Sequence, residues 1–263
     1  MGKTIGVISL KGGVGKTSVV ASLGDAIADF GKKVLLIDGN LSSPSLGLHL
    51  NLINPEKTLH HVLDRSVNTK DAIYEFGNFH LMPASIFDRV DVNPLALRDR
   101  IKGLKRLYDF IIIDSSPALD AETLAVMSAS DEILAVTTPD RPTLSATIKA
   151  VNFAKRKGTP IAGIVLNKVH NKSFEIPFED IEETLDVPIL AVVPYDVKVL
   201  ESLAHMTPYT SHKPNSKGSV EYKKLAASLI GEKFKPFSFG DFFRLSPKKQ
   251  EVNRELYYKS AFR

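Results

Sequence analysis

The sequence predicts a doubly wound α/β fold, in which helices flank both faces of a mostly parallel sheet. Its short apolar runs, such as residues 110–113, do not alternate between polar and apolar side chains. Strands of that kind have both faces covered, which is typical of parallel sheets. Most of the runs are followed by a stretch with the apolar spacing of an amphipathic helix, which indicates repeated βα units.

The predicted strands and helices alternate along the chain. Strands are expected at residues 4–9, 33–38, 109–114, 132–137, 160–166 and 188–193. Helices are expected at residues 18–30, 94–107, 121–128, 143–157 and 178–185. Two short helices and a strand at 78–83 are expected within residues 51–93, and a loop at 207–217. Ligands bind beyond the carboxyl ends of the strands in such sheets, so polar residues there are candidate site residues.

The length and composition indicate a large globular domain. The chain has 263 residues, of which 43% are hydrophobic and 24% charged. A domain of this size buries roughly 70–75% of the surface of its unfolded chain, so it can fold without disulfides or a structural metal. The chain has no cysteine, which excludes thiol catalysis, thiolate zinc sites and cysteine-held iron–sulfur clusters. Without a long apolar run or a signal-peptide pattern, we expect a cytoplasmic protein.

The composition changes near Gly231. Residues 232–263 contain eight Lys or Arg and four acidic residues, so this tail carries the whole net charge of +4. It also contains eight of the 21 Phe and Tyr residues. We therefore expect one domain over residues 1–231, followed by a basic, Phe-rich C-terminal tail over residues 232–263.

A glycine-rich loop with two lysines follows the first expected strand. It comprises Lys11, Gly12, Gly13, Val14, Gly15, Lys16, Thr17 and Ser18, and it leads into a helix. Glycines allow backbone conformations in which consecutive N–H groups point at phosphate oxygens, and the helix adds the positive end of its dipole. Lys16 is placed to neutralise the β and γ phosphates, and the Thr17 hydroxyl can bind Mg²⁺. The strict pattern has glycine where Leu10 stands, so the loop is a variant; a glycine-rich turn without a ligand is the alternative.

With its additional Lys11, this stretch resembles the deviant Walker A motif of the MinD/ParA family of P-loop ATPases, whose pattern starts at that lysine. The resemblance covers roughly residues 3–205 and implies a P-loop NTPase fold of the MinD/ParA type, with ATP and Mg²⁺ as ligands. In that family the first lysine reaches the phosphates of the partner's ATP in a sandwich dimer. The resemblance thus implies a homodimer on ATP binding, with Lys11 and Lys16 as catalytic residues. A solvated loop lysine is the alternative for Lys11.

Two aspartates at the ends of expected strands extend the resemblance. Asp38 matches the family's switch I entry, and residues 108–117 match its Walker B strand and switch II, which contains Asp114. A carboxylate at a strand's carboxyl end can hold a water of Mg²⁺ while it stays ionised. Asp114 is therefore a candidate metal ligand together with Thr17, and a helix N-cap is the alternative for Asp114.

Two later segments resemble the family's base-binding residues. Residues 163–168 are similar to the segment whose asparagine reads the adenine edge, which implies that role for Asn167. An asparagine offers both a donor and an acceptor, as an adenine edge requires. Residues 193–196 resemble the loop that packs against the base, which implies contacts from Pro194, Tyr195 and Asp196. The alternatives are a turn cap for Asn167 and a purely structural role for the loop.

Position 40 departs from the family pattern. The family usually has a second acid two residues after the switch I aspartate, where it orients or activates the attacking water, but this chain has Asn40. An amide can orient water but cannot take its proton and brings no negative charge. The resemblance implies catalytic roles for both Asp38 and Asn40, and Asp38 could cover part of the deficit. A carboxylate held by the waters of Mg²⁺ is, however, badly placed to take a proton from the attacking water as well. We therefore expect slow ATP hydrolysis.

The tail has features of a membrane anchor. Residues 238–241 have the form of a capping box, and Phe239, Phe242 and Phe243 share one face of a helix. A second helix is expected from Ser246 and Pro247, with proline at its first position. Phenylalanines with nearby basic residues fit the interfacial segment that ends MinD-type proteins. They fit equally well a segment that covers an apolar patch of the chain's own domain or of a partner subunit.

The residues and the resemblance lead to three functional hypotheses. The first is a MinD-like switch ATPase that dimerises around Mg-ATP and positions itself or a regulatory protein at the inner face of the cell membrane. The second is a ParA-type DNA partition ATPase, but residues 155–157 are the only compact basic run outside the tail, so nucleic acid is the less expected partner. The third is a nucleotide-locked adaptor with little or no hydrolysis, which Asn40 favours. The family's iron–sulfur carriers are disfavoured, so no iron–sulfur cluster is expected.

Overall fold

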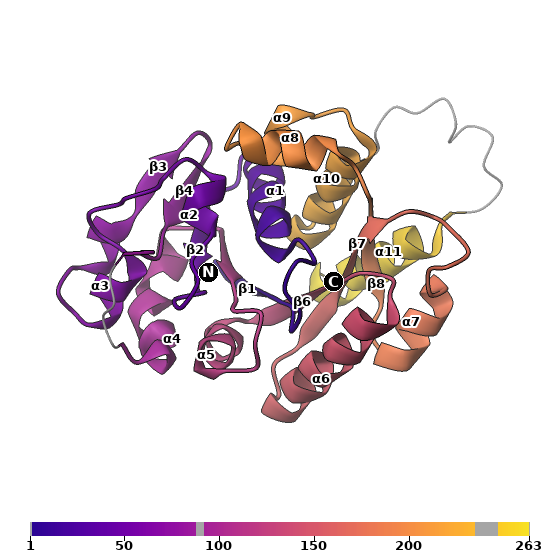
Figure 1. Ribbon diagram of the computed structural model, residues 1–263, viewed down its shortest axis with the longest axis horizontal. Helices are drawn as coiled ribbons and strands as arrows, with labels where there is room; N and C mark the ends of the chain where they lie inside the picture. Colours follow the sequence, from indigo (N-terminus) through magenta and orange to yellow (C-terminus); the bar gives the residue numbers. More distant parts are fainter. Residues whose placement is uncertain (1, 88–91, 235–246, 263) are drawn as a thin grey trace.

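An eight-stranded sheet forms the centre of the computed structural model, which describes residues 2–87, 92–234 and 247–262 (Figure 1). Its strands are Lys3–Ile8 (β1), Val34–Asp38 (β2), Tyr74–Phe76 (β3), Phe79–Met82 (β4), Phe110–Asp114 (β5), Glu132–Thr137 (β6), Ile161–Val169 (β7) and Ile189–Pro194 (β8). They lie in the order β3-β4-β2-β5-β1-β6-β7-β8. Only the pair of β3 and β4 is antiparallel among these neighbours. The predicted doubly wound, mostly parallel sheet is confirmed.

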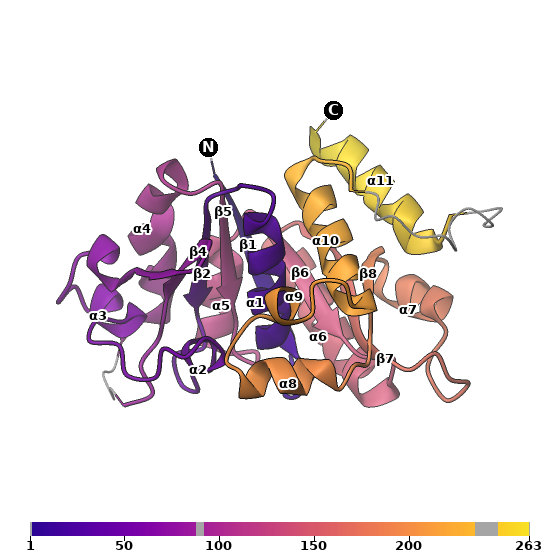
Figure 2. The same ribbon diagram turned by 90° about the horizontal axis from the view of Figure 1, so that it is seen from above.

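Helices cover both faces of the sheet (Figures 1 and 2). One layer contains Lys16–Ala28 (α1), Lys198–Ala204 (α8), Tyr209–His212 (α9) and Lys217–Ile230 (α10). The opposite layer contains Leu97–Ile101 (α4), Ala121–Ala129 (α5), Arg141–Lys157 (α6) and Phe178–Leu185 (α7). Before β5 the chain also forms the short helices Leu46–His49 (α2) and Leu59–Leu63 (α3), and the 3₁₀ helices Thr69–Ala72 (η1), Pro94–Ala96 (η2) and Lys102–Arg106 (η3).

The central strands are buried on both faces. Every residue of β2 and β5 is buried, and Leu36 pairs with Ile112 where the two strands run in parallel. Full burial of one such side chain contributes about 1.5–3 kcal/mol, which holds the register of the two strands. Because the register is fixed, Asp38 and Asp114 are paired at the same carboxyl end of the sheet.

The predicted strands are confirmed, and most helix boundaries are close to those expected. The first helix begins at Lys16 instead of residue 18, because Gly15 adopts a left-handed conformation as its N-cap. The single helix expected at residues 94–107 is wrong: η2, α4 and η3 are three short pieces. Gly103 within η3 disfavours a continuous α-helix there.

Four helices fall outside the predicted pattern: the first is α2, which precedes the two short helices expected within residues 51–93. α9 lies within the expected loop at 207–217, and neither α8 nor α10 was among the expected helices. Ten of the 14 residues of α10 are buried, including polar ones such as Ser219 and Glu221. A helix covered on so many sides does not show the apolar stripe by which sequence periodicity is recognised.

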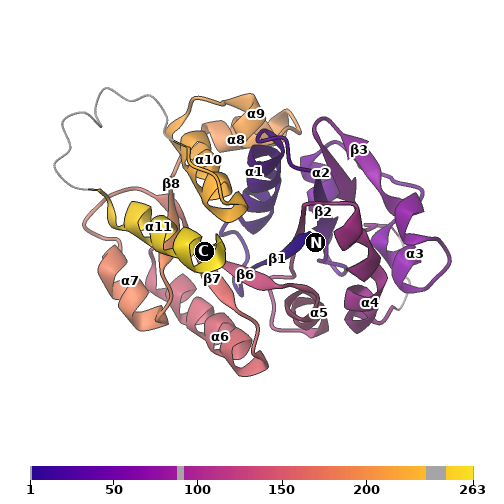
Figure 3. The ribbon, with the colours of Figure 1, turned by 180° about the vertical axis from the view of Figure 1, so that it is seen from behind.

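The C-terminal helix Lys249–Phe262 (α11) packs against β8 and α10 (Figure 3). It begins two residues after Pro247, so the expected proline at its first position is wrong. Tyr257 is buried and its hydroxyl donates to Glu132 at 2.6 Å. Arg254 is buried and pairs with Glu221 at 2.8 Å. Residues 249–262 therefore pack on the chain's own domain, which was one of the two alternatives for the tail.

The rest of the tail remains largely a prediction. The expected capping box at residues 238–241 and the group of Phe239, Phe242 and Phe243 lie outside the described residues. The division of the chain after residue 231 also stays a prediction. Within the described ranges, none of the helices has the length and apolar character needed to cross a membrane.

Candidate nucleotide-binding site

A cavity of about 480 Å³ lies at the carboxyl ends of the central strands. The glycine-rich loop at residues 11–18 lines one part of it, and Asn40, Asn167 and residues 194–196 line other parts. The structure thus brings together loop, switch and base-binding residues that are far apart in the sequence. Asp38 and Asp114 end the strands β2 and β5 directly behind the loop.

The loop owes its shape to two glycines with positive φ. Gly13 has φ 80° and Gly15 has φ 88°, in the left-handed region that other residues rarely adopt. A Cβ at Gly15 would also lie only 2.5 Å from Nδ2 of Asn167. The loop leads directly into α1, so the free N–H groups and positive dipole of a 13-residue helix face the cavity.

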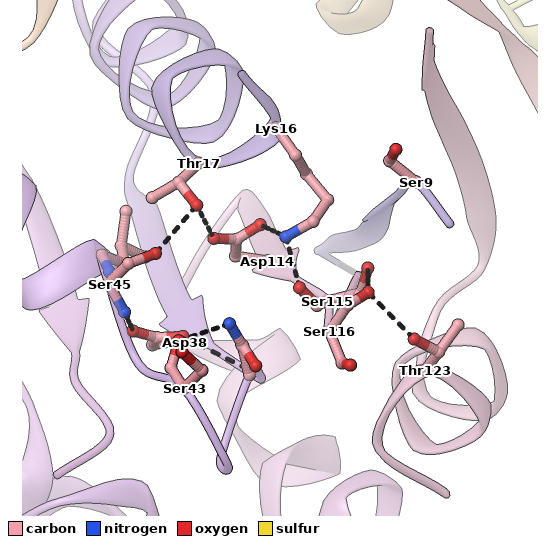
Figure 4. A network of polar contacts seen from close by, with 12 residues as sticks. Ser9, Lys16, Thr17, Asp38, Ser43, Ser45, Asp114, Ser115, Ser116 and Thr123 are labelled. Carbon is pink, nitrogen blue, oxygen red and sulfur yellow. Dashed lines mark hydrogen bonds and ion pairs between the residues drawn. The ribbon is translucent and has the colours of Figure 1, made fainter. Parts of the chain in front are cut away.

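Lys16, Thr17 and Asp114 converge at the start of α1 (Figure 4). The buried Lys16 ammonium pairs with the Asp114 carboxylate and donates a hydrogen bond to the backbone oxygen of Ser115. The Thr17 hydroxyl donates to the other carboxylate oxygen of Asp114 at 2.6 Å and lies 3.0 Å from the Ser45 hydroxyl. The lysine charge is therefore paired with the Asp114 carboxylate.

Asp38 holds the loop that follows β2. Its carboxylate accepts hydrogen bonds from the backbone N–H groups of Ser45 at 3.0 Å, Leu46 at 2.9 Å and Asn40 at 3.2 Å. Burial and the neighbouring Asp114 charge raise the pKa of Asp38 to about 7. These contacts place Asp38 as an anchor of the switch I segment.

The side chain of Asn40 forms a hydrogen bond through its nitrogen and none through its oxygen, among the described residues. Its Nδ2 donates to the backbone oxygen of Ser43. Its Oδ1 is buried and has no hydrogen-bond partner among the described residues. Asn40 lines the cavity, and its Oδ1 is an acceptor without a donor at the wall of that cavity.

These residues fit Mg²⁺ and a nucleotide. The Thr17 hydroxyl and the Asp114 carboxylate are oxygen donors of the kind Mg²⁺ prefers, and Mg²⁺ usually takes one or two carboxylates together with substrate phosphates and water. The Oδ1 of Asn40 is an acceptor that the described residues leave without a hydrogen-bond donor. Thr17 and Asp114 are thus the residues that could hold the cation, as the sequence predicts.

The other end of the cavity contains the predicted base-binding residues. Asn167 donates from Nδ2 to the Val14 backbone oxygen at 2.7 Å, which leaves its Oδ1 as an acceptor. Pro194 ends β8, and Tyr195 is exposed and stacks on His170 with ring centroids 4.8 Å apart. The contacts of these residues with adenine stay predictions. The hydrogen bond from Asn167 to Val14 agrees equally well with a role of Asn167 in holding the glycine-rich loop.

The Asp196 carboxylate accepts hydrogen bonds from the Tyr209 hydroxyl at 2.6 Å and from the Lys198 N–H at 2.9 Å. Burial raises the pKa of Asp196, but these two hydrogen bonds outweigh it, and the net shift is downward. Burial and the bond to Asp196 raise the pKa of Tyr209 to about 12. Asp196 is therefore ionised and Tyr209 is protonated near neutral pH.

Lys11 points away from Lys16. Its ammonium lies 3.0 Å from the Thr143 hydroxyl and 3.4 Å from the Asp140 carboxylate, near the start of α6. Its side chain is 43% exposed, so it can reach a group outside the chain. The contact with a partner's nucleotide stays a prediction.

Sequence reasoning missed several residues of the cavity. Lys168 donates to the Gly13 backbone oxygen at 2.7 Å, and its position directly after Asn167 was the available signal. Tyr209 and the α8 residues Leu200 and Leu203 line the base end. No sequence signal identified them, because their helices were not predicted.

A strand, a left-handed glycine loop and a helix in direct succession, with a buried lysine beside the aspartate of a neighbouring strand, define a P-loop nucleotide-binding protein. Two family models match the chain: an AAA domain at residues 2–156 and the NUBPL iron-transfer P-loop NTPase at residues 104–230.

Comparisons with individual proteins specify the family. An uncharacterized ATP-binding protein of Methanocaldococcus jannaschii is 36% identical, over 89% of this chain and 90% of its own. The cell division ATPase MinD of Pyrococcus furiosus is 38% identical with a TM-score of 0.80, over 86% of this chain and 97% of its own. The septum site-determining protein MinD of Pyrococcus horikoshii, solved with Mg-ADP, is 36% identical with a TM-score of 0.81, over 87% of this chain and 96% of its own. The chain belongs to the MinD/ParA family of P-loop ATPases.

Proposed function

We propose that the protein is a MinD-like switch ATPase that binds Mg-ATP, dimerises around it and hydrolyses it slowly. The convergence of Lys16, Thr17 and Asp114 beneath the glycine-rich loop carries the proposal. Lys11 beside the same loop supports the dimer, because its side chain is 43% exposed and could exchange its contact with Asp140 for a nucleotide bound by a second copy. Membership of an ATPase family supports the reaction.

ATP binding would exchange the partner of Lys16. The lysine would leave Asp114 for phosphate oxygens, which also accept hydrogen bonds from the loop N–H groups. Asp114 and Thr17 would then be free to hold Mg²⁺. When bound, the cation would neutralise phosphate charge and orient the γ-phosphate.

The rate of hydrolysis would depend on how Asn40 orients the attacking water. Its buried, unpartnered Oδ1 can accept one hydrogen bond from an attacking water and so orient it. It cannot take the proton, so turnover should be slow and the ATP-bound dimer long-lived. The same observation favours a second candidate function, a nucleotide-locked adaptor that binds ATP and a partner with little or no hydrolysis.

The dimer would position itself or a regulatory protein at the inner face of a membrane, with the tail as the candidate contact. Relatives that act in cell division support this role at the level of the family. DNA is a less favoured partner, because Lys155 in the basic run at 155–157 already pairs with Asp186 at 2.8 Å. Partition of DNA is therefore one outcome of the test and not the proposal.

The test measures size and partner binding of the full chain with Mg-ATP, Mg-ADP or no nucleotide. Light scattering should show a dimer with Mg-ATP alone, and sedimentation with anionic phospholipid vesicles should increase in the same condition. The variant Lys16→Ala is the control and should stay monomeric. ATP-dependent binding to DNA but not to vesicles would favour the partition ATPase, and a chain that stays monomeric with ATP would refute the switch.

A further inference from the structure

The base end of the cavity contains a polar connection that neither the motifs nor the proposed mechanism uses. Phosphates occupy the loop side in the proposed function, so the base must lie toward Leu200, Leu203 and residues 194–196. Asp196 is the charged group of that loop, and both of its oxygens are held from within the chain. The residue that holds it most closely is Tyr209.

Tyr209 is fixed in the domain both by burial of its ring and by a hydrogen bond of its hydroxyl. It is fully buried, and its ring packs where a Cβ at Gly218 would lie 2.8 Å from ring atom Cε1. Its hydroxyl donates to Asp196 at 2.6 Å across 13 residues of sequence. A protonated phenol can only donate in this bond when its partner is an ionised carboxylate, so the bond has one direction.

The next residues of α9 attach this tyrosine to the phosphate end of the site. Asp25 of α1 is buried and accepts hydrogen bonds from the hydroxyls of Thr210 and Ser211, the latter at 2.8 Å. Since α1 begins at Lys16, one helix sets the position of the phosphate lysine and, through Asp25 and α9, of the base loop.

The bonds made by Asp196 leave free acceptor sites on its carboxylate for the base. A carboxylate has about four lone-pair sites, and Tyr209 and the Lys198 N–H fill two of them. Asn167 uses one N–H of its amide on the Val14 backbone oxygen and keeps the other N–H and its Oδ1. The negative charge of the Asp196 carboxylate favours a purine that carries an amino group at C6 and repels one that carries a carbonyl oxygen there.

We propose that Tyr209 is a positioning residue for nucleobase selection: it holds the Asp196 carboxylate so that the site prefers adenine over guanine nucleotides. This inference rests on the proposed ATP site. Tyr209 lies outside the motifs and acts through Asp196. Asp25 anchors α9, the helix that carries Tyr209.

The test measures equilibrium binding of Mg-ATP and Mg-GTP by calorimetry for the wild-type chain, Tyr209→Phe, Asp196→Ala and the double variant. Tyr209→Phe keeps the ring and removes only the hydroxyl. A hydrogen bond to a charged group supports an effect of about tenfold, so we expect ATP affinity to fall about three- to tenfold with little change for GTP. In the Asp196→Ala background, Tyr209→Phe should leave the ATP-to-GTP ratio unchanged, because the carboxylate through which it acts is gone.

Tyr108→Phe is the matched control. Tyr108 is also buried, and its hydroxyl lies 2.6 Å from the His80 ring nitrogen in another part of the core. The variant Tyr108→Phe should leave the ratio of ATP affinity to GTP affinity unchanged. If Tyr209→Phe fails to fold, which circular dichroism would show, Asp196→Asn tests the same selectivity with the tyrosine in place and should lower the ATP-to-GTP ratio.

Two results overturn the inference while the proposed function stands: a wild-type chain that binds ATP and GTP equally, or a Tyr209→Phe variant that weakens both nucleotides by the same factor. The second result would mean that Tyr209 supports only the fold of the cavity. A wild-type chain that binds neither nucleotide would overturn the proposed function and this inference together.

Discussion

Replacing Asn40 by aspartate tests how the site handles the attacking water. The exchange supplies the carboxylate that the family usually has, in a residue of almost the same shape. It also removes the amide that donates to the Ser43 backbone oxygen. The variant therefore gains a proton acceptor and loses a contact that holds the switch loop.

The two effects differ in size. A positioned proton acceptor contributes about 10² to 10⁴ in rate, which corresponds to about 2.7–5.5 kcal/mol of barrier. Loss of the hydrogen bond costs about 0.5–1.5 kcal/mol, and a carbonyl oxygen left without a donor costs about 1–3 kcal/mol. The gain lowers the reaction barrier, whereas the loss acts on the stability of the switch loop, so turnover should rise, with an upper limit of about 10² to 10⁴. The loss should appear as lower stability and as a shorter lifetime of the ATP-bound dimer.

Phosphate release under saturating Mg-ATP measures the rate, and light scattering after a chase with ADP measures the lifetime of the dimer. Asn40→Ala should be slower than the wild-type chain, because it removes both the acceptor and the loop contact. Asn93→Asp is the matched control, since the Asn93 side chain accepts a hydrogen bond from the Leu95 N–H at the start of η2. If Asn40→Asp is no faster than the wild-type chain, then water is not activated at position 40 and the transfer of the switch I role is wrong.

Three further substitutions test the binding site, the dimer and the tail. Lys16→Ala removes a charge-assisted phosphate contact of about 1.5–3 kcal/mol, so calorimetry should show ATP affinity about ten- to a hundredfold lower. Lys11→Ala should bind ATP nearly as well as the wild-type chain but fail to dimerise in light scattering; a normal dimer would exclude the contact with the partner's nucleotide. Arg254→Ala leaves the buried Glu221 without its partner, so chemical unfolding should show a loss of about 3–5 kcal/mol, whereas Lys259→Ala at an exposed pair should cost less than about 1 kcal/mol.

The sheet could be predicted because each buried strand is a short apolar run, as in residues 110–113. The loop could be predicted because Gly13 and Gly15 are required by positive φ and because two lysines flank them at fixed spacing. These features are local, so the sequence displays them without knowledge of the tertiary structure.

The base end could not be predicted in the same way. Tyr209 reaches Asp196 only because α9 packs on α1 through Asp25, and that packing depends on buried polar contacts that have no periodicity. Likewise the pairing of Lys16 with Asp114 in the free chain follows from the neighbouring positions of β1 and β5. Contacts of this kind depend on the order of strands in the sheet, which sequence patterns do not determine.

The docking of α11 limits how the tail could act at a membrane. Two of its basic residues form ion pairs with the domain: Lys249 pairs with Glu182, and Arg254 pairs with Glu221. A lysine that is paired in this way supplies little attraction for anionic lipid. The tail therefore attracts an anionic membrane less than its formal charge of +4 would indicate. Membrane attachment through the docked face of α11 would require undocking, which would expose Glu221 and the Tyr257 site to water. Val252 and Leu256 are exposed while α11 is docked, so these residues of the helix could contact a membrane without that cost.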